Sequence, residues 1–107
     1  MNIVEQHRKE IELLCETHMV DSLFVFGSVL TDKFDNKSDV DFLVVFGQVD
    51  LNNYADNYFD FVEALEKLLG RKVDLVSEKK LVNPYLIKSI NRNRIKIYER
   101  RNPGLAA

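Results

Sequence analysis

Apolar side chains recur along this chain at two different spacings. In some segments they return every three or four residues, as in an amphipathic helix, and in others they form short β-branched and aromatic runs typical of buried strands. Helices are predicted over residues 3–18, 54–69 and 84–91. Strands are predicted over residues 23–26, 40–46, 72–76 and 95–98. This alternation predicts an α/β (α+β) fold in which helices cover a small mixed β-sheet.

Glycine, proline and polar residues mark the ends of several predicted elements. Gly70 stands where the glycine that follows a helix is expected, and Pro84 suits the first turn of the last helix. Residues 28–33 are predicted to form a short helix or turn, and residues 35–38 a polar turn. The last strand, at 95–98, is short and alternating, which is typical of a sheet edge.

Length and composition indicate one globular domain. The chain has 107 residues, of which 46% are hydrophobic, so residues 1–100 are predicted as a single domain and 101–107 as a flexible tail. A membrane helix needs about 20 consecutive apolar residues, and the apolar runs here are far shorter. The single cysteine, Cys15, cannot form an internal disulfide. These features predict a protein without a membrane span in a reducing, cytoplasmic setting.

The net charge of −2 hides a strong asymmetry along the chain. Residues 1–70 carry a net charge of −9, and residues 71–107 carry +7. The basic third is either a solvated face or a contact surface for a polyphosphate, RNA or an acidic partner. The acidic balance of the whole chain argues against stable binding to duplex DNA.

Two polar groups interrupt the apolar pattern at the ends of predicted strands. Gly27-Ser28 follows the first strand, and Asp39-Val40-Asp41 begins the second. Side chains two apart in a strand point to the same face, so Asp39 and Asp41 project together and away from the core. Carboxylates about 6–7 Å apart repel by roughly 2–3 kcal/mol at an effective dielectric constant of 20. A divalent cation would turn that penalty into binding, and carboxylate oxygens suit Mg²⁺ or Mn²⁺.

Asp74 is a third acidic candidate, placed inside the predicted strand 72–76. A carboxylate there is disfavoured without a partner. If this strand lies beside strand 40–46, Asp74 joins the other two aspartates in a two-metal site for in-line displacement at phosphorus. A strand-start or edge-strand position without chemistry is the plainer alternative for all three. Gly27 permits close backbone approach to a phosphate, and the Ser28 hydroxyl and following N–H groups can bind it.

The segment 27–41, GSVLTDKFDNKSDVD, resembles the signature of the DNA polymerase β-like nucleotidyltransferase superfamily, in which Gly-Ser precedes Asp-x-Asp by ten residues. The short chain and a later third aspartate resemble its minimal branch, the MNT proteins. The resemblance implies the polymerase β-like fold, covering roughly residues 20–98. It also implies that Gly27 and Ser28 hold the triphosphate of ATP. By the same resemblance, Asp39 and Asp41 are expected to bind two metal ions (Mg²⁺ or Mn²⁺), and Asp74 is expected to complete the site and activate the acceptor hydroxyl.

The resemblance also implies a partner. MNT proteins are typically encoded beside a HEPN-type toxin and act as antitoxins, either by binding it, by transferring AMP to a tyrosine on it, or both. One departure favours the non-catalytic alternative, a binding module that neutralises its partner by covering it. The family commonly has an arginine shortly after the serine, where this chain has Thr31. A third possibility, transfer to a small molecule or an RNA end, would need a homodimer to build the acceptor cleft.

The remaining polar and aromatic residues are expected to be structural. His7 and His18 are predicted to lie partly buried on one stripe of the first helix, and Cys15 is predicted to be buried or half-buried. Tyr58 and Phe59 are neighbours in the middle helix, so one of them must face away from the core. Phe59 is therefore a candidate partner contact.

Overall fold

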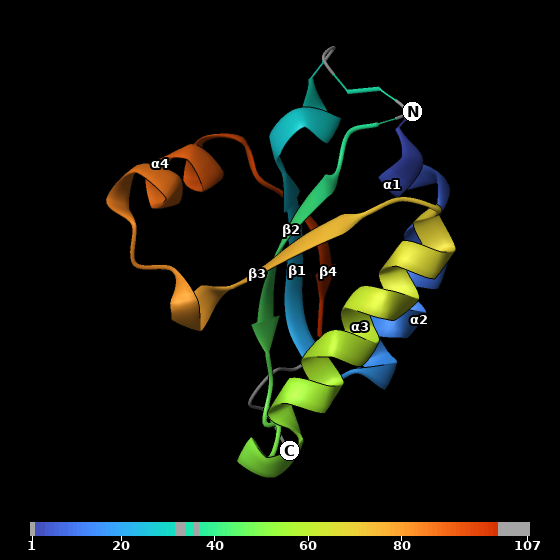
Figure 1. The fold of residues 1–107 in the computed structure, drawn as a ribbon, viewed down its shortest axis with the longest axis vertical. Helices are drawn as coiled ribbons and strands as arrows, with labels where there is room; N and C mark the ends of the chain where they lie inside the picture. The colour runs from blue at the N-terminus through green and yellow to red at the C-terminus, as the bar shows by residue number, and fades with distance from the viewer. Residues whose placement is uncertain (1, 32–33, 36, 101–107) are drawn as a thin grey trace.

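A four-stranded sheet in the order β3-β2-β1-β4 forms the centre of the protein in a computed structural model that describes residues 2–31, 34–35 and 37–100 (Figure 1). The strands are β1 (Val20–Phe26), β2 (Val40–Phe46), β3 (Val73–Ser77) and β4 (Ile95–Glu99). Strand β1 is antiparallel to both β2 and β4, whereas β2 and β3 are parallel. The predicted mixed sheet is confirmed, with β3 and β4 as its edges.

Helices cover both faces of the sheet (Figure 1). They are α1 (Ile3–Gln6), α2 (Arg8–Thr17), α3 (Tyr54–Leu69) and α4 (Pro84–Asn93). Short 3-10 turns connect them at η1 (Gly27–Leu30), η2 (Leu51–Asn53) and η3 (Glu78–Lys80). Helices α2 and α3 lie together on one side of the sheet, and α4 lies on the other. Within the described residues, none of these helices is both long and apolar enough to cross a bilayer.

The hydrophobic core has two parts, one on each face of the sheet. The main cluster joins β1 and β2 to α2 and α3 and includes Phe42 and Phe61, both fully buried. A smaller cluster of Phe26, Leu43 and Ile90 lies under α4. Cys15 is buried as predicted. The α4 side of the sheet therefore has much less apolar packing than the α2–α3 side.

The first predicted helix is wrong in one respect, because residues 3–18 form two helices with a break at His7. The His7 Nδ1 lies 3.0 Å from the Ile3 carbonyl oxygen, which a continuous α-helix would have paired with the His7 N–H. That N–H instead donates to the Val4 carbonyl, three residues back. Both histidines are half-buried as predicted, and the His18 ring packs 5.3 Å from the Phe61 ring.

The other predicted helices and strands are confirmed with small shifts at their ends, whereas residues 32–33 and 36 of the predicted turns 28–33 and 35–38 lie outside the described residues. Helix 54–69 and strand 40–46 match α3 and β2. Gly70 caps α3 in the left-handed conformation, with φ of 67°. Strand β1 begins three residues earlier than predicted, because polar residues at a bulge between Val20 and Ser22 hid its start. The predicted flexible tail, 101–107, lies outside the described residues.

Candidate active site

Asp41 and Asp74 lie side by side on neighbouring strands. They are register partners across the parallel pair of β2 and β3. Val40 and Phe42 flank Asp41 and are buried in the main core, so Asp41 must project to the opposite face of the sheet. Asp74 projects to that same face, because register partners on adjacent strands share a face. The predicted strand 72–76 therefore does lie beside strand 40–46, as the three-aspartate site requires.

Asp39 completes the acidic group from the segment just before β2. Its side chain is exposed, whereas that of Asp41 is half-buried. Burial, followed by the charges of Asp74 and Asp39, raises the pKa of Asp41 to about 6. The charges of Asp39 and Asp74 thus lie close enough to oppose the ionisation of Asp41, as the sequence predicted for Asp39.

Gly27 places the η1 turn directly against Asp41. Its φ is +83°, and a Cβ atom at this position would lie 2.3 Å from the Asp41 Oδ2 atom. The register between β1 and β2 pairs Phe26 with Asp41, which explains this close approach. Only glycine can occupy the position without displacing the carboxylate. Glycine is therefore needed here for a reason that the sequence did not reveal.

Ser28 lies inside the η1 turn and does not cap its start, since the residue at the N-cap position is Phe26. The Ser28 carbonyl accepts hydrogen bonds from both the backbone N–H and the hydroxyl of Thr31, each at 2.9 Å. Thr31 therefore folds back onto the turn at the position where an arginine was expected. The turn itself places Ser28 one residue from the contact between Gly27 and Asp41.

The donor set at this end of the sheet suits a hard divalent cation. All three side chains offer carboxylate oxygens, the ligands that Mg²⁺ and Mn²⁺ prefer. Burial, and then the charges of Asp74 and Asp39, raise the pKa of Asp41, so a cation beside this carboxylate would be favourable. Across the described residues, no three such side chains already stand in ligating positions. The fold therefore gathers the acidic groups, and a bound ion would have to draw them into their final geometry.

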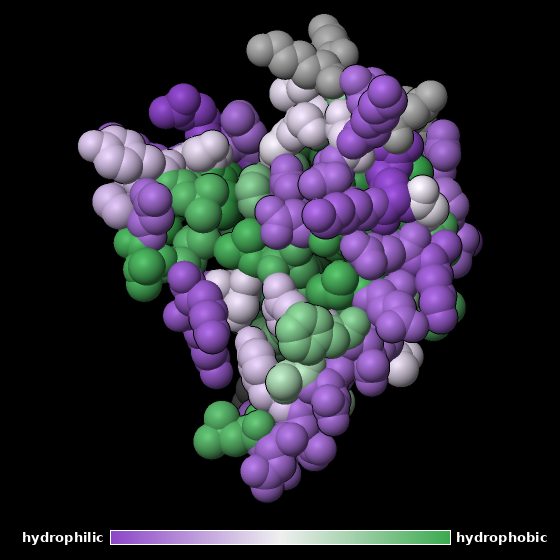
Figure 2. Space-filling view, viewed as in Figure 1, coloured by the Kyte–Doolittle hydropathy of each residue, from purple (hydrophilic) through white to green (hydrophobic). Residues whose placement is uncertain are grey.

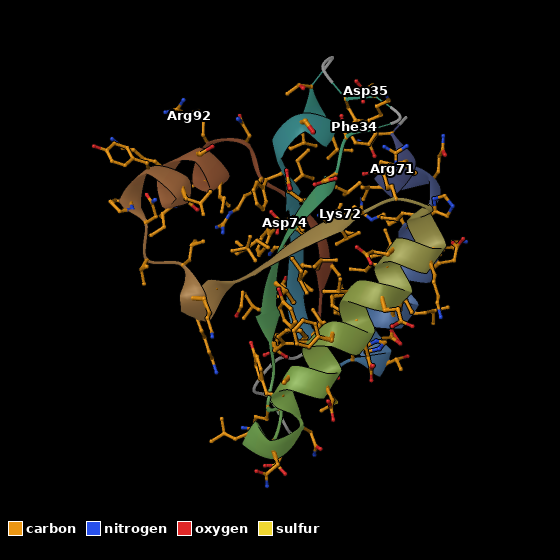
Figure 3. The ribbon with its side chains drawn as sticks, in the orientation of Figure 1. Phe34, Asp35, Arg71, Lys72, Asp74 and Arg92 are labelled. Atoms are coloured by element: carbon orange, nitrogen blue, oxygen red, sulfur yellow. The ribbon has the colours of Figure 1, made fainter. Side chains whose placement is uncertain are left out.

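Helix α4 borders the acidic group and carries part of the positive charge of the C-terminal third. Ile90 anchors the helix to the sheet in the smaller apolar cluster. Lys88 and Arg92 on the same helix are exposed, and Figure 3 shows Arg92 on α4 and Asp74 on β3. The basic residues thus include exposed side chains on an element that packs over the aspartate face.

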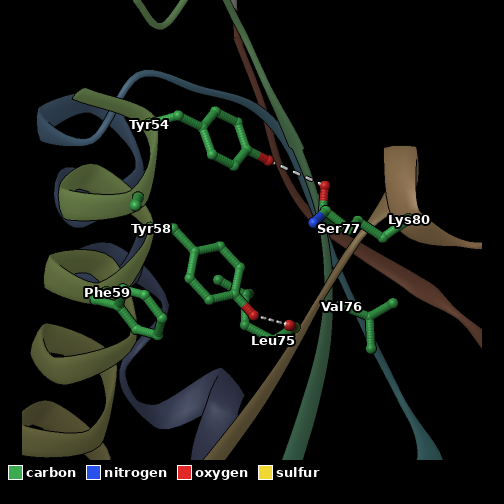
Figure 4. Close-up of a pocket in the computed structure, with 8 residues that line it drawn as sticks. Tyr54, Tyr58, Phe59, Leu75, Val76, Ser77 and Lys80 are labelled. Atoms are coloured by element: carbon green, nitrogen blue, oxygen red, sulfur yellow. Dashed lines mark hydrogen bonds between the residues drawn. The ribbon is translucent and has the colours of Figure 1, made fainter. Parts of the chain in front are cut away.

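A groove that was not predicted from the sequence opens between α3 and the free edge of β3. Its cavity of about 460 Å³ is lined by Tyr54, Ala55, Tyr58, Phe59, Leu75, Val76, Ser77 and Lys80. The Tyr54 hydroxyl lies 3.1 Å from the Ser77 hydroxyl, and the Tyr58 hydroxyl donates to the Leu75 carbonyl (Figure 4). Burial, and then the charge of Asp74, raises the pKa of Tyr58.

Phe59 is the member of the adjacent aromatic pair that faces outward. Its side chain is 66% exposed, whereas Tyr58 is half-buried. The expectation that one of the two must turn away from the core is confirmed. The adjacency of two large aromatic residues was the only sequence signal for this surface.

Comparison with known proteins gives consistent matches over nearly the whole chain. A family model described as a nucleotidyltransferase domain matches residues 4–97. The chain is 40% identical over 95 residues to a Methanocaldococcus jannaschii protein named as a candidate protein adenylyltransferase, a match that covers 87% of this chain and 92% of the relative.

Solved structures share the same fold. One described as a candidate minimal nucleotidyltransferase superposes with a TM-score of 0.72 at 32% identity, over 89% of this chain and 95% of that one. A structure of a tri-AMPylated Shewanella oneidensis HEPN toxin in complex with an MNT antitoxin matches with a TM-score of 0.62, over 90% of this chain and 72% of that one. At 16% identity, the second likeness concerns the fold alone.

Proposed function

The chain belongs to the nucleotidyltransferase domain family, and from that premise we propose that it transfers AMP from ATP to a tyrosine hydroxyl of a HEPN-type partner protein. The family match also confirms the resemblance to the minimal nucleotidyltransferases. The observation that carries the proposal is the pairing of Asp41 with Asp74 across β2 and β3, with Gly27 held against Asp41. Further support for a protein acceptor comes from the relative named as a candidate protein adenylyltransferase.

We assign the metal-binding role to Asp39, Asp41 and Asp74, with Mg²⁺ or Mn²⁺ as the ion. When bound, such ions neutralise charge that develops on the transferring phosphoryl oxygens. Gly27 and Ser28 are assigned to the triphosphate, because the η1 turn lies beside Asp41. The carboxylate of Asp41 must be ionised to act as a ligand, which its pKa of about 6 allows at neutral pH.

The proposed reaction joins the tyrosine oxygen to the α-phosphorus of ATP. The bond from that phosphorus to the pyrophosphate oxygen breaks, and pyrophosphate leaves. Asp74 is exposed on the edge strand β3, where an incoming hydroxyl can reach it, and we assign to it the acceptance of the tyrosine proton. The products are AMP-protein and pyrophosphate.

A labelling experiment tests the assignment. The chain and its HEPN-type partner are incubated with α-³²P-labelled ATP and Mg²⁺, and label on the partner is measured after electrophoresis. We expect labelling by the wild type and none by Asp39→Asn or Asp41→Asn. Asp50→Asn is the matched control, because Asp50 is an exposed aspartate beyond the other end of β2. Full labelling by Asp39→Asn or Asp41→Asn contradicts the proposed chemistry.

A non-catalytic antitoxin is the second candidate function. The observation that favours it is Thr31, which stands at the family's arginine position and folds onto the Ser28 carbonyl. Without a guanidinium there, one common phosphate contact is missing from the η1 turn. A toxicity assay separates the two functions, because a pure binding module protects equally well as wild type and as Asp39→Asn. Loss of protection in that variant supports catalysis.

A further inference from the structure

Asp39 lies outside the hydrogen-bond ladder that holds the other two aspartates. Strand β2 begins at Val40, and Asp39 is the exposed residue before it. Asp41 and Asp74 are positioned by their strands, but Asp39 depends on the turn that leads into β2. A ligand on an unsupported segment would have to be ordered each time an ion binds, which weakens binding. The contacts of that turn therefore matter for the site.

The Arg71 side chain binds the backbone of this turn. Its Nη1 atom donates to the Asp35 carbonyl at 2.9 Å and to the Ser38 carbonyl at 3.2 Å. Its guanidinium also lies over the Phe34 ring, 4.6 Å from the ring centroid. Figure 3 shows Phe34, Asp35 and Arg71 close together at one end of the sheet. One half-buried arginine thus contacts three residues of the segment that precedes Asp39.

We propose that Arg71 is a positioning residue that holds Asp39 in place for metal binding, an inference that rests on the proposed function. The Ser38 carbonyl belongs to the peptide group that leads into Asp39, and Arg71 binds it. On the other side of Asp39, the Val40 N–H donates to the Lys72 carbonyl at 3.0 Å. Two consecutive residues, Arg71 and Lys72, therefore hold the backbone on both sides of Asp39.

The same short segment also carries Asp74, which follows Lys72 by two residues. The segment 71–74 thus supplies one carboxylate and holds the backbone of another. This arrangement sets the separation of Asp39 and Asp74 through a few local contacts. It links the two strands at the end of the sheet where the acidic group lies.

The turn that Arg71 binds is also stabilised by its own hydrogen bonds. The Asp35 carboxylate accepts from the Lys37 N–H at 2.8 Å and from the Ser38 hydroxyl at 3.1 Å. These hydrogen bonds, with a smaller contribution from Arg71, hold the pKa of Asp35 below its ordinary value. Arg71 therefore attaches a turn with its own internal order to the start of β3.

Lysine would not replace Arg71 in this role. A planar guanidinium can stack on an aromatic ring while it donates in its own plane to two carbonyl oxygens. An ammonium group has no such plane, so it cannot make the stack and both hydrogen bonds in the same way. The Arg71 Nε atom is buried and has no partner among the described residues, a cost that these contacts must offset.

The test measures Mn²⁺ binding to the full chain by calorimetry, in wild type and in Arg71→Lys. Loss of an outer-shell partner typically weakens metal binding by about 10–100-fold, and we expect a loss of about tenfold in Arg71→Lys. Arg8→Lys is the matched control, since Arg8 bridges Glu5 and Glu12 and reaches the Lys96 carbonyl at 3.5 Å on the α2 side. Unchanged Mn²⁺ affinity in folded Arg71→Lys overturns the proposal.

Two further measurements keep the result decisive. Amide hydrogen exchange at Asp39 and Val40 should quicken in Arg71→Lys and not in Arg8→Lys, and unchanged exchange also overturns the proposal. Phe34→Leu removes the ring but keeps the carbonyl contacts, so an intermediate loss of Mn²⁺ affinity supports the role. If the wild type binds no Mn²⁺, the assigned metal site is wrong, and the exchange measurement alone then decides whether Arg71 holds the turn.

Discussion

The two faces of strand β2 differ in what they carry, because one packs apolar side chains against α2 and α3 and the other carries Asp41. Val40, Phe42 and Val44 point toward α2 and α3 and are fully buried. Burying such side chains stabilises a fold by roughly 1.5–3 kcal/mol each. The opposite face carries Asp41 beside Asp74 and only a small apolar cluster under α4. Most of the apolar packing that stabilises the sheet therefore lies on the α2–α3 face, and the carboxylates lie on the α4 face.

The largest effect on stability should come from the face of β2 that packs against α2 and α3. Phe42→Ala removes a fully buried ring from the main core, and we expect a loss of about 3–5 kcal/mol in the free energy of unfolding. Val45→Ala changes a half-buried residue on the other face and should cost less. Urea denaturation measures both. Equal losses would contradict the asymmetry between the two faces.

Substitution of Asp41 on the acidic face should lower AMP transfer strongly and should not lower stability. Asp41→Asn removes a proposed metal ligand, so we expect AMP transfer to fall by more than the roughly 100-fold that losing an outer-shell partner can cost. The same change removes a carboxylate whose pKa is raised to about 6 by burial and by its neighbours. The metal-free variant should therefore melt at a higher temperature than wild type at pH 7, as followed by circular dichroism. A lower melting temperature would show that the Asp41 carboxylate is stabilising.

Variants of the two glycines with positive φ distinguish the effect of backbone strain from the effect of contact with Asp41. Gly27→Ala places a Cβ 2.3 Å from Asp41 Oδ2, whereas nothing lies within 4 Å of a Cβ at Gly70. Both variants should lose about 1–3 kcal/mol of stability from the left-handed backbone. Only Gly27→Ala should also reduce AMP transfer, measured with labelled ATP. Equal activity in the two variants would mean that the close approach of η1 to Asp41 has no functional role.

Metal binding should depend on pH through Asp41. As pH falls below about 6, the ion must displace a proton, so Mn²⁺ affinity should fall by up to about tenfold per pH unit.

The stability of the metal-free protein should change with pH in the opposite direction. Between the ordinary value of 3.8 and about 6, the native state binds more protons at Asp41 than the unfolded state. Stability should therefore fall as pH rises through this window, and it should do so less in Asp41→Asn.

The smallest effect on stability is expected at the groove between α3 and β3. Phe59 is 66% exposed, so Phe59→Ala should change stability by no more than about 0.5 kcal/mol. If Phe59 contacts the partner, the affinity for that partner should fall by about tenfold. Leu51→Ala is the control, because Leu51 is 90% exposed but does not line the groove. Equal partner affinities in the two variants would exclude the contact.

Much of this architecture followed from local patterns. The spacing of apolar residues predicted the first and last residues of α3 and β2 correctly, because each pattern spans an element that buries one continuous face. The break at His7 was not visible, since it depends on a side chain that bonds its own helix. The start of β1 was hidden for a similar reason, because a bulge carries polar residues into the strand.

The amino-acid sequence by itself determined which side of β2 carries Asp41, because alternation along a strand is a local property. Only the tertiary structure decided that β3 pairs beside β2 with Asp74 opposite Asp41, that Gly27 meets the Asp41 carboxylate, and that Arg71 reaches the turn before Asp39. Those contacts join residues up to 36 positions apart. Their register depends on how α3, which connects β2 to β3, packs against the sheet, and no local periodicity encodes that packing.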